Sequence, residues 1–199
     1  PLKDFTPLAR LVMVPQLLIV PAASPYATLA DVIKAAQTKP GGLSIASQGN
    51  GTGGHVFAET LRRETQGQLN HIPYRGSAPA LTDMIGGQVD LMFDAIGTSG
   101  PFVKDGKLRA LAVGAPARVP MFPQVATLQE LGYPQLNMVA WFGMVVKAGT
   151  PAAVVQRLGD WRTGAPGWSG AKSALISALS LCLLLRTDDE TSQFLLLME

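Results

Sequence analysis

Nine residues, Ser47-Gln48-Gly49-Asn50-Gly51-Thr52-Gly53-Gly54-His55, have the types and spacing to hold an anion. They join an apolar, strand-like segment (43–46) to a helix-like one (56–64). Glycines let the backbone turn sharply and approach a ligand, and hydroxyl and amide side chains add uncharged donors. The free N–H groups and the positive dipole end of the following helix face the same space. We expect a carboxylate or phosphate site without Lys or Arg; a glycine-rich turn with a helix cap and no ligand is the alternative.

The glycine spacing excludes two nucleotide-binding motifs. The pattern Gly49-x-Gly51-x-Gly53-Gly54 lacks the third-glycine offset of a dinucleotide fingerprint. No Lys-Ser or Lys-Thr pair follows the glycines, as a phosphate-binding loop of nucleotide hydrolases would require. Binding of a small anion is compatible with both exclusions.

Composition narrows the class of protein. The 199 residues are 47% hydrophobic and 15% charged, which is typical of one sizeable soluble domain or two small ones. A net charge of +2 without a basic cluster disfavours nucleic acid and anionic membranes as partners. The single cysteine, Cys182, excludes an internal disulfide, and two histidines without nearby carboxylates or thiols make a metal site a poor prediction. No apolar run reaches the ~20 residues of a membrane span. A chain that starts at Pro1 is expected to be a processed product or a fragment.

The elements that must position the anion loop alternate along the chain. Apolar runs predict strands at 11–20, 43–46, 69–72, 89–93, 108–113 and 139–146. Capping and periodicity predict helices at 28–39, 56–64, 77–85, 127–131 and 151–158, with a loop and a turn over 95–107. Such alternation predicts parallel sheets covered by helices. Ligands of open parallel sheets sit beyond the carboxyl ends of strands, where segments 47–55, 74–78 and 94–99 fall, so these can converge on one cleft.

Several motifs in unbroken order carry a family resemblance. They cover residues 1 to about 158, and together they resemble the substrate-binding proteins of tripartite tricarboxylate transporters, the Bug family. The motifs are Pro1-Leu2-Lys3-Asp4-Phe5-Thr6-Pro7, Ser47-x-Gly49-Asn50-Gly51-Thr52-x-x-His55, Pro73-Tyr74-Arg75-Gly76-Ser77-Ala78-Pro79-Ala80, Gly87-Gln88-Val89-Asp90-Leu91-Met92-Phe93-Asp94, Gly106-Lys107-Leu108-Arg109-Ala110-Leu111-Ala112-Val113, and Trp141-Phe142-Gly143 followed by Ala148-Gly149-Thr150-Pro151.

The resemblance implies a periplasmic solute receptor with the α/β, two-lobe fold of periplasmic binding proteins and mainly parallel sheets. Such a receptor has no catalytic role and no cofactor or metal, and it delivers a small carboxylated ligand to a membrane permease. Dicarboxylates, tricarboxylates, acidic amino acids and aromatic acids are all candidate ligands. We expect residues 21–118 to form the second lobe, and 1–20 with 119–158 to form an incomplete first lobe. Residues 159–199 depart from the family, and we expect an atypical tail from a shifted reading frame or a fusion end.

The resemblance also assigns ligand-binding residues, in two clusters and one acidic position. The assigned residues are Ser47, Asn50, Gly51, Thr52 and His55, then Tyr74, Gly76, Ser77 and Ala78, and finally Asp94. The structural alternatives are a satisfied helix histidine for His55, a half-buried core residue for Tyr74, and a turn cap for Asp94. Arg75 is expected to be solvated rather than a carboxylate clamp.

Two other functions are alternatives to a receptor. The effector-sensing domain of a LysR-type transcription regulator uses a similar two-lobe fold, although the motifs fit it less well. An enzyme would use Ser47 or Ser77 as nucleophile and His55 or His71 as base. The sequence has no Gly-x-Ser-x-Gly elbow and no evident acidic partner for either histidine, which disfavours that reading.

Overall fold

The computed structural model describes residues 3–160, and these divide into two compact units. The larger unit holds residues 13–141, and the smaller holds residues 3–12 and 142–160. The larger unit extends beyond the predicted second lobe of 21–118 at both ends, and the assignment of lobes stays a prediction. The predicted tail, apart from its first two residues, lies outside the described residues.

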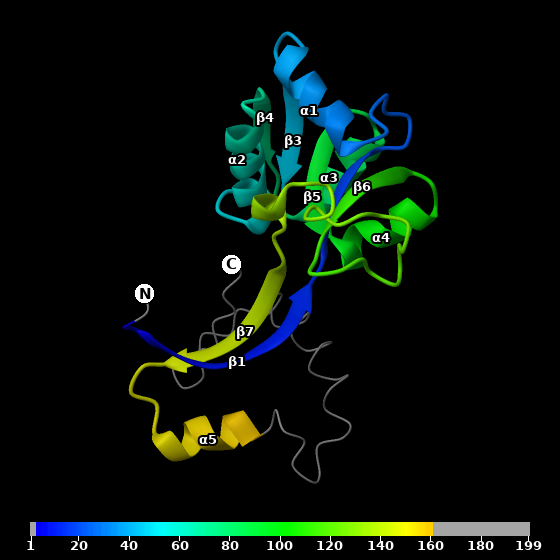
Figure 1. Ribbon diagram of the computed structural model, residues 1–199. Helices are drawn as coiled ribbons and strands as arrows, with labels where there is room; N and C mark the ends of the chain where they lie inside the picture. Colours follow the sequence, from blue (N-terminus) through cyan, green and yellow to red (C-terminus); the bar gives the residue numbers. More distant parts are fainter. Residues whose placement is uncertain (1–2, 161–199) are drawn as a thin grey trace. The chain divides into compact units, whose positions relative to one another are not determined.

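A five-stranded sheet forms the centre of the larger unit (Figure 1). Its order is β4 (Leu69–Pro73), β3 (Leu43–Ser47), β5 (Leu91–Ala95), β2 (Gln16–Pro21) and β6 (Leu108–Gly114). Strand β3 pairs in parallel with β4 and β5, as the alternation predicted. Strand β2 pairs antiparallel with both β5 and β6, so the sheet is mixed.

Pro15 divides the predicted strand 11–20 into two. Strand β1 (Phe5–Val14) ends before it and β2 begins after it. Proline has no N–H for a ladder hydrogen bond, so a continuous strand cannot pass through this position with its pairing intact. Its carbonyl is used instead, accepting from the Ile96 N–H at 3.0 Å.

Side-chain alternation along the strands builds a core on each face of the sheet. Leu18 and Val20 pack with the buried faces of α1 (Leu29–Thr38) and α2 (Gly53–Thr65). Leu17 and Ile19 pack on the opposite face, together with α3 (Ser77–Ile85) and α4 (Ile96–Lys104). Because successive strand residues point to opposite faces, the continuous apolar run of β2 is buried on both sides.

Helix α4 corrects the prediction of a loop over 95–107. Gly97, Gly100 and Pro101 are poor helix formers, and they concealed the helical pattern in the sequence. Tertiary packing outweighs this local preference: Phe102 and Val103 contact the core on that face of the sheet, and Gly100 is buried.

The helix predicted at 127–131 is also wrong. Thr127 and Glu130 do form a reciprocal cap, in which the Thr127 N–H donates to Glu130 Oε2 at 2.7 Å and the Glu130 N–H donates to Thr127 Oγ1 at 3.0 Å. The turn stops at Gly132, whose φ is +88°, and Pro134 follows. A 3₁₀ turn, Pro134–Leu136, takes the place of further helix.

Arg109, near the start of β6, fastens the loop that joins β2 to α1. Its guanidinium donates to the carbonyls of Ala22 at 2.9 Å, Tyr26 at 2.9 Å and Ser24 at 3.2 Å. One planar cation thus satisfies three backbone acceptors of an irregular segment. Arg109 is therefore committed to the fold.

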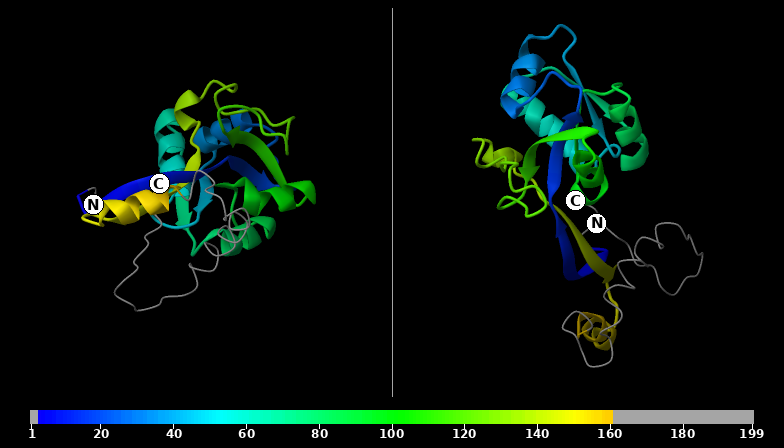
Figure 2. Two further views of the ribbon diagram at one scale, coloured as in Figure 1. Left: turned by 90° about the horizontal axis from the view of Figure 1, so that it is seen from below. Right: turned by 90° about the vertical axis from the view of Figure 1, so that its right-hand side faces the viewer.

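The smaller unit contains a two-stranded ribbon and one helix. Strands β1 and β7 (Ala140–Lys147) are hydrogen-bonded neighbours, and Figure 2 shows them side by side in two further views. The Ala148 N–H donates to the Asp4 carbonyl at 2.8 Å and closes one end of the ribbon. The helix predicted at 151–158 is present as α5 (Ala152–Asp160), which begins one residue later. None of the helices within residues 3–160 has the length and apolarity needed to cross a membrane.

Candidate ligand-binding site

The three predicted segments lie at the carboxyl-terminal edge of the five-stranded sheet, where strands β3, β4 and β5 end. In the parallel pairing Ser47 is opposite Pro73, so β3 and β4 end together, and Asp94 is the penultimate residue of β5. Two backbone hydrogen bonds join the first two segments directly. The Tyr74 N–H donates to the Ser47 carbonyl at 3.0 Å, and the Gly76 N–H donates to the Gln48 carbonyl at 3.1 Å. The three segments therefore lie together, and that they line one cleft stays a prediction.

The glycine loop is a compact turn held by its own groups. Gly49 and Gly51 have φ values of +138° and +79°, which favour glycine. Thr52 Oγ1 donates to the Gly49 carbonyl at 2.7 Å, and the Gly51 N–H donates to His55 Nδ1 at 3.0 Å. Asn50 and Gly51 are exposed at the tip of the turn, where a ligand can reach them.

Three helices begin at this edge, and none has a side-chain cap. The N-cap residues of α2, α3 and α4 are Thr52, Gly76 and Ala95, and none of their side chains bonds a first-turn N–H. Helix α1 differs, because Thr28 and Asp31 form a complete capping box at its start. First-turn N–H groups without a side-chain cap are ready donors, and the helix dipole favours a negative group beside them.

Ser47 and the two histidines form a stacked, hydrogen-bonded cluster. Ser47 Oγ lies 2.6 Å from His71 Nε2, and it also accepts from the Gly49 N–H at 3.2 Å. The rings of His55 and His71 stack with centroids 4.1 Å apart and planes 3° apart. Burial, and secondarily the neighbouring His55, lower the pKa of His71. Because His55 Nδ1 accepts a hydrogen bond, that ring is assigned as the Nε2–H tautomer.

Asp94 lies beneath the loops, with none of its surface exposed. Its Oδ1 accepts from Gln48 Nε2 at 2.7 Å and from Ser77 Oγ at 2.6 Å, and its Oδ2 accepts from Thr98 Oγ1. The sequence prediction placed this carboxylate at the ligand. The structure places it where neighbouring side chains occupy both oxygens.

The second predicted cluster also contains Tyr74, Gly76 and Ala78, which differ in their contacts and exposure. The Tyr74 hydroxyl donates to Asp83 Oδ2 at 2.8 Å, and burial followed by this hydrogen bond raises the pKa of Tyr74. Gly76 has a φ of +104° and is the N-cap of α3. Ala78 is exposed, and so is Arg75, which agrees with the expected solvated position of that arginine.

Sequence reasoning missed three residues that the structure brings into this cluster: Gln48, His71 and Thr98. Gln48 lies inside the glycine loop, but its amide side chain does not distinguish it in the sequence from the other polar residues there. His71 is identified from the sequence only as a candidate general base, because its contact with Ser47, from a position paired with Ile45 two residues before Ser47, depends on the strand pairing. Thr98 follows Asp94 by four residues, and that spacing becomes a signal only once α4 is recognised as a helix.

The cluster meets one requirement of a nucleophile–base pair and lacks others. Ser47 Oγ is within hydrogen-bond reach of His71, but Ser47 is fully buried. Among the described residues no carboxylate hydrogen-bonds either histidine. In the same part of the chain, no group of three His, Cys, Asp or Glu side chains could hold a metal ion.

Comparisons with known proteins agree with this architecture. The chain shares 34% identity and a TM-score of 0.73 with an R. palustris protein solved with adipate, over 79% of this chain and 53% of that one. MatC from Rhodopseudomonas palustris with bound malate is 32% identical, with a TM-score of 0.75, over 84% of this chain and 57% of that one. The periplasmic binding protein BugD is 32% identical, with a TM-score of 0.70, over 83% of this chain and 56% of that one. The fold is therefore that of a periplasmic binding protein.

Sequence relatives define the family. Residues 1–168 match the family described as the tripartite tricarboxylate transporter family receptor. A UPF0065 protein from the tcbD–tcbE intergenic region of a Pseudomonas species is 38% identical over 157 residues, covering 78% of this chain and 47% of the relative. BugT of Bordetella pertussis is 30% identical over 154 residues, covering 77% and 47%. The chain belongs to this receptor family, and it spans about half the length of the curated relatives it matches.

Proposed function

We propose that this chain contributes the binding wall of a periplasmic receptor that captures a small carboxylated ligand for a tripartite tricarboxylate transporter. The observation that carries the proposal is the convergence of α2 and α3, each begun without a side-chain cap, on one edge of the sheet. Backbone N–H groups and hydroxyls recognise a carboxylate there without a cation. Ligands in solved relatives, adipate and malate, have this chemistry.

Within this proposal the exposed tip of the loop makes the first contact. Asn50 and Gly51 are exposed, and Thr52, His55, Gly76 and Ser77 are partly exposed around them. The ligand class is a dicarboxylate, a tricarboxylate, an acidic amino acid or an aromatic acid. A membrane permease receives the ligand. The chain spans about half of its relatives, so we expect it to hold one wall of the cleft and to bind weakly.

Two observations favour a receptor over the alternatives. An enzyme requires an accessible serine beside an oriented histidine. Ser47 is buried, and the hydroxyl of Ser77 donates to Asp94. No carboxylate hydrogen-bonds His55 or His71 among the described residues. The family is one of receptors, and none of the relatives reported above is a LysR-type regulator.

A thermal melt of the 199-residue chain with malate or adipate at millimolar concentration tests the proposal. A ligand that binds only the folded state raises the midpoint in proportion to RT ln(1 + [L]/Kd). We expect a rise with the acids and none with their neutral diamides. Titration calorimetry should then give a dissociation constant weaker than micromolar; micromolar or tighter binding would contradict the one-wall proposal.

Asn50→Asp tests the position of the site. It adds a carboxylate at an exposed loop tip, and two unit charges 4 Å apart interact by about 1 kcal/mol in water, so we expect about fivefold weaker binding of malate. Gln129→Glu makes the same chemical change at an exposed position in the 127–132 turn and should leave affinity unchanged. Equal affinities for the two variants would place the ligand elsewhere.

A further inference from the structure

Asp94 is a buried carboxylate without a cationic partner among the described ion pairs. Moving an ionised group out of water is costly, so such a group persists only where hydrogen bonds replace its hydration. Here all the replacement comes from neutral donors. This arrangement calls for an explanation beyond packing, because an apolar residue would fill the same space without that cost.

The donors come from three different segments of the site. Gln48 belongs to the glycine loop that leads into α2, Ser77 is the first residue of α3, and Thr98 lies in the first turn of α4. One carboxylate therefore holds the beginnings of three helices at the edge where the ligand is proposed to bind. Gln48 Nε2 also donates to the Phe93 carbonyl at 3.0 Å, which fixes its amide along the end of β5.

The close packing at Gly54 shows that the Gln48 side chain, which donates to Asp94, has little room to move. A Cβ at this position would lie 2.5 Å from Gln48 Oε1 and 3.1 Å from the Phe93 carbonyl. The Gln48 amide thus fills the space between α2 and Asp94, and any side chain at 54 displaces it. The tie from Asp94 reaches the first turn of α2 through Gln48.

We propose that Asp94 is a positioning residue of the binding site: it sets the conformation of the glycine loop and of the α3 start from below, without touching the ligand. This inference rests on the proposed function. Buried polar networks rigidify their surroundings when fully satisfied, and a loop held in its binding conformation loses less entropy on binding. A neutral amide at 94 presents one acceptor oxygen where the carboxylate presents two, so at least one of the three hydrogen bonds to residue 94 must be lost or reversed.

The test compares Asp94→Asn with Asp90→Asn. Asp90 also accepts hydrogen bonds, at the opposite end of the sheet, where its Oδ2 accepts from the Ser44 N–H at 2.8 Å and from Ser44 Oγ at 2.7 Å. Both variants should lower stability to urea. Titrations with malate and adipate, monitored through amide NMR chemical shifts, should show a dissociation constant at least tenfold higher than that of the wild-type chain for Asp94→Asn only. Equal losses of affinity in both variants, or wild-type affinity in Asp94→Asn, would overturn the proposal.

Thr98→Val is a second variant that keeps the shape of the side chain and removes one donor. We expect threefold or more loss of affinity, with recovery in Thr98→Ser, which restores the hydroxyl. If wild-type chain binds neither probe, the proposed function fails, but hydrogen exchange still decides the positioning role. Amides of residues 49–54 and 76–78 should then exchange at least tenfold faster in Asp94→Asn and Thr98→Val than in Asp90→Asn, and equal rates would refute the role.

Discussion

The most direct stability prediction concerns Arg109, which bonds the connection between β2 and α1. Its guanidinium donates to the carbonyls of Ala22, Ser24 and Tyr26, so we expect it to stabilise the β2–α1 connection rather than to bind a carboxylate. Arg109→Met keeps the apolar stem and removes every donor. The variant leaves three carbonyls that water must satisfy.

The magnitude follows from the number and exposure of those acceptors. A hydrogen bond to a charged group contributes about 1.5–3 kcal/mol, but these carbonyls lie in partly exposed residues and can be rehydrated. Taking about 1 kcal/mol for each of the three bonds, we expect a loss of about 3 kcal/mol in the free energy of unfolding. Arg109→Lys should recover part of this loss, because an ammonium cannot match the planar fork.

Urea denaturation followed by far-UV circular dichroism measures the effect as a lower midpoint with an unchanged slope. The control is Arg62→Met, which removes an exposed ion pair with Glu59 and should change stability by less than about 0.5 kcal/mol. Equal midpoints for Arg109→Met and Arg62→Met would refute the reasoning. A loss of malate binding by Arg109→Met at full stability would instead assign Arg109 a part in ligand binding.

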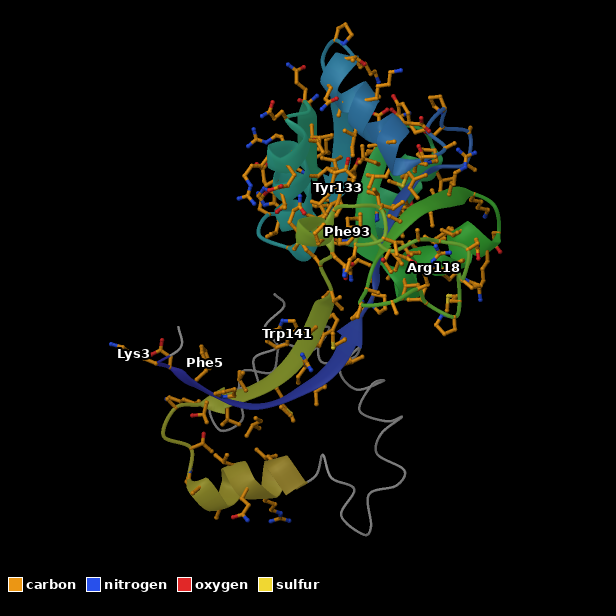
Figure 3. All side chains as sticks on the ribbon, viewed as in Figure 1. Lys3, Phe5, Phe93, Arg118, Tyr133 and Trp141 are labelled. Atoms are coloured by element: carbon orange, nitrogen blue, oxygen red, sulfur yellow. The ribbon has the colours of Figure 1, made fainter. Side chains whose placement is uncertain are left out.

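Three further predictions concern the core and the site. Phe57→Ala removes a fully buried ring that stacks on Phe93 (labelled in Figure 3) with centroids 3.8 Å apart, and should cost about 3–5 kcal/mol in urea unfolding; a cost under 1 kcal/mol would contradict the packing. Gly54→Ala should weaken malate binding in calorimetry by displacing Gln48, and wild-type affinity would show that the loop tolerates the shift. Burial lowers the pKa of His71 below its ordinary 6.5, so as the pH falls the unfolded chain takes up a proton on this histidine before the folded chain does. The free energy of unfolding should therefore fall as the pH drops through 6.5, by at most about 1.4 kcal/mol per pH unit. His71→Gln should remove this pH dependence in urea unfolding.

Periodicity and capping located most of the fold. The capping box at Thr28 and Asp31 defined the start of α1, and apolar runs defined β3, β4 and β6. Helix α4 escaped because its glycines and proline oppose a helix locally, and only contact with the sheet compensates. The antiparallel direction of β2 escaped as well, because a strand buried on both faces has the same pattern in either direction.

The site was predictable in place but not in its internal connections. Glycines and hydroxyls at a strand–helix junction marked the loop, and the carboxyl-edge rule placed the segments together. Ser47 and Asp94 are buried and bond other side chains of the site, which could not be predicted without knowing which side chains at the strand ends are buried and which are exposed. Burial of a polar residue at a strand end leaves no trace in the residue types around it.

The position of β2 has a consequence for how the chain folds. This strand comes from residues 16–21, yet it lies inside the sheet, between β5 and β6, and pairs with residues 92–95 and 108–114. The sheet therefore cannot close during synthesis until residue 114 is available, and pairings so distant in sequence favour slow folding. Removing the first 21 residues would not trim an edge. It would split the sheet and expose two unpaired strand edges, a known route to aggregation.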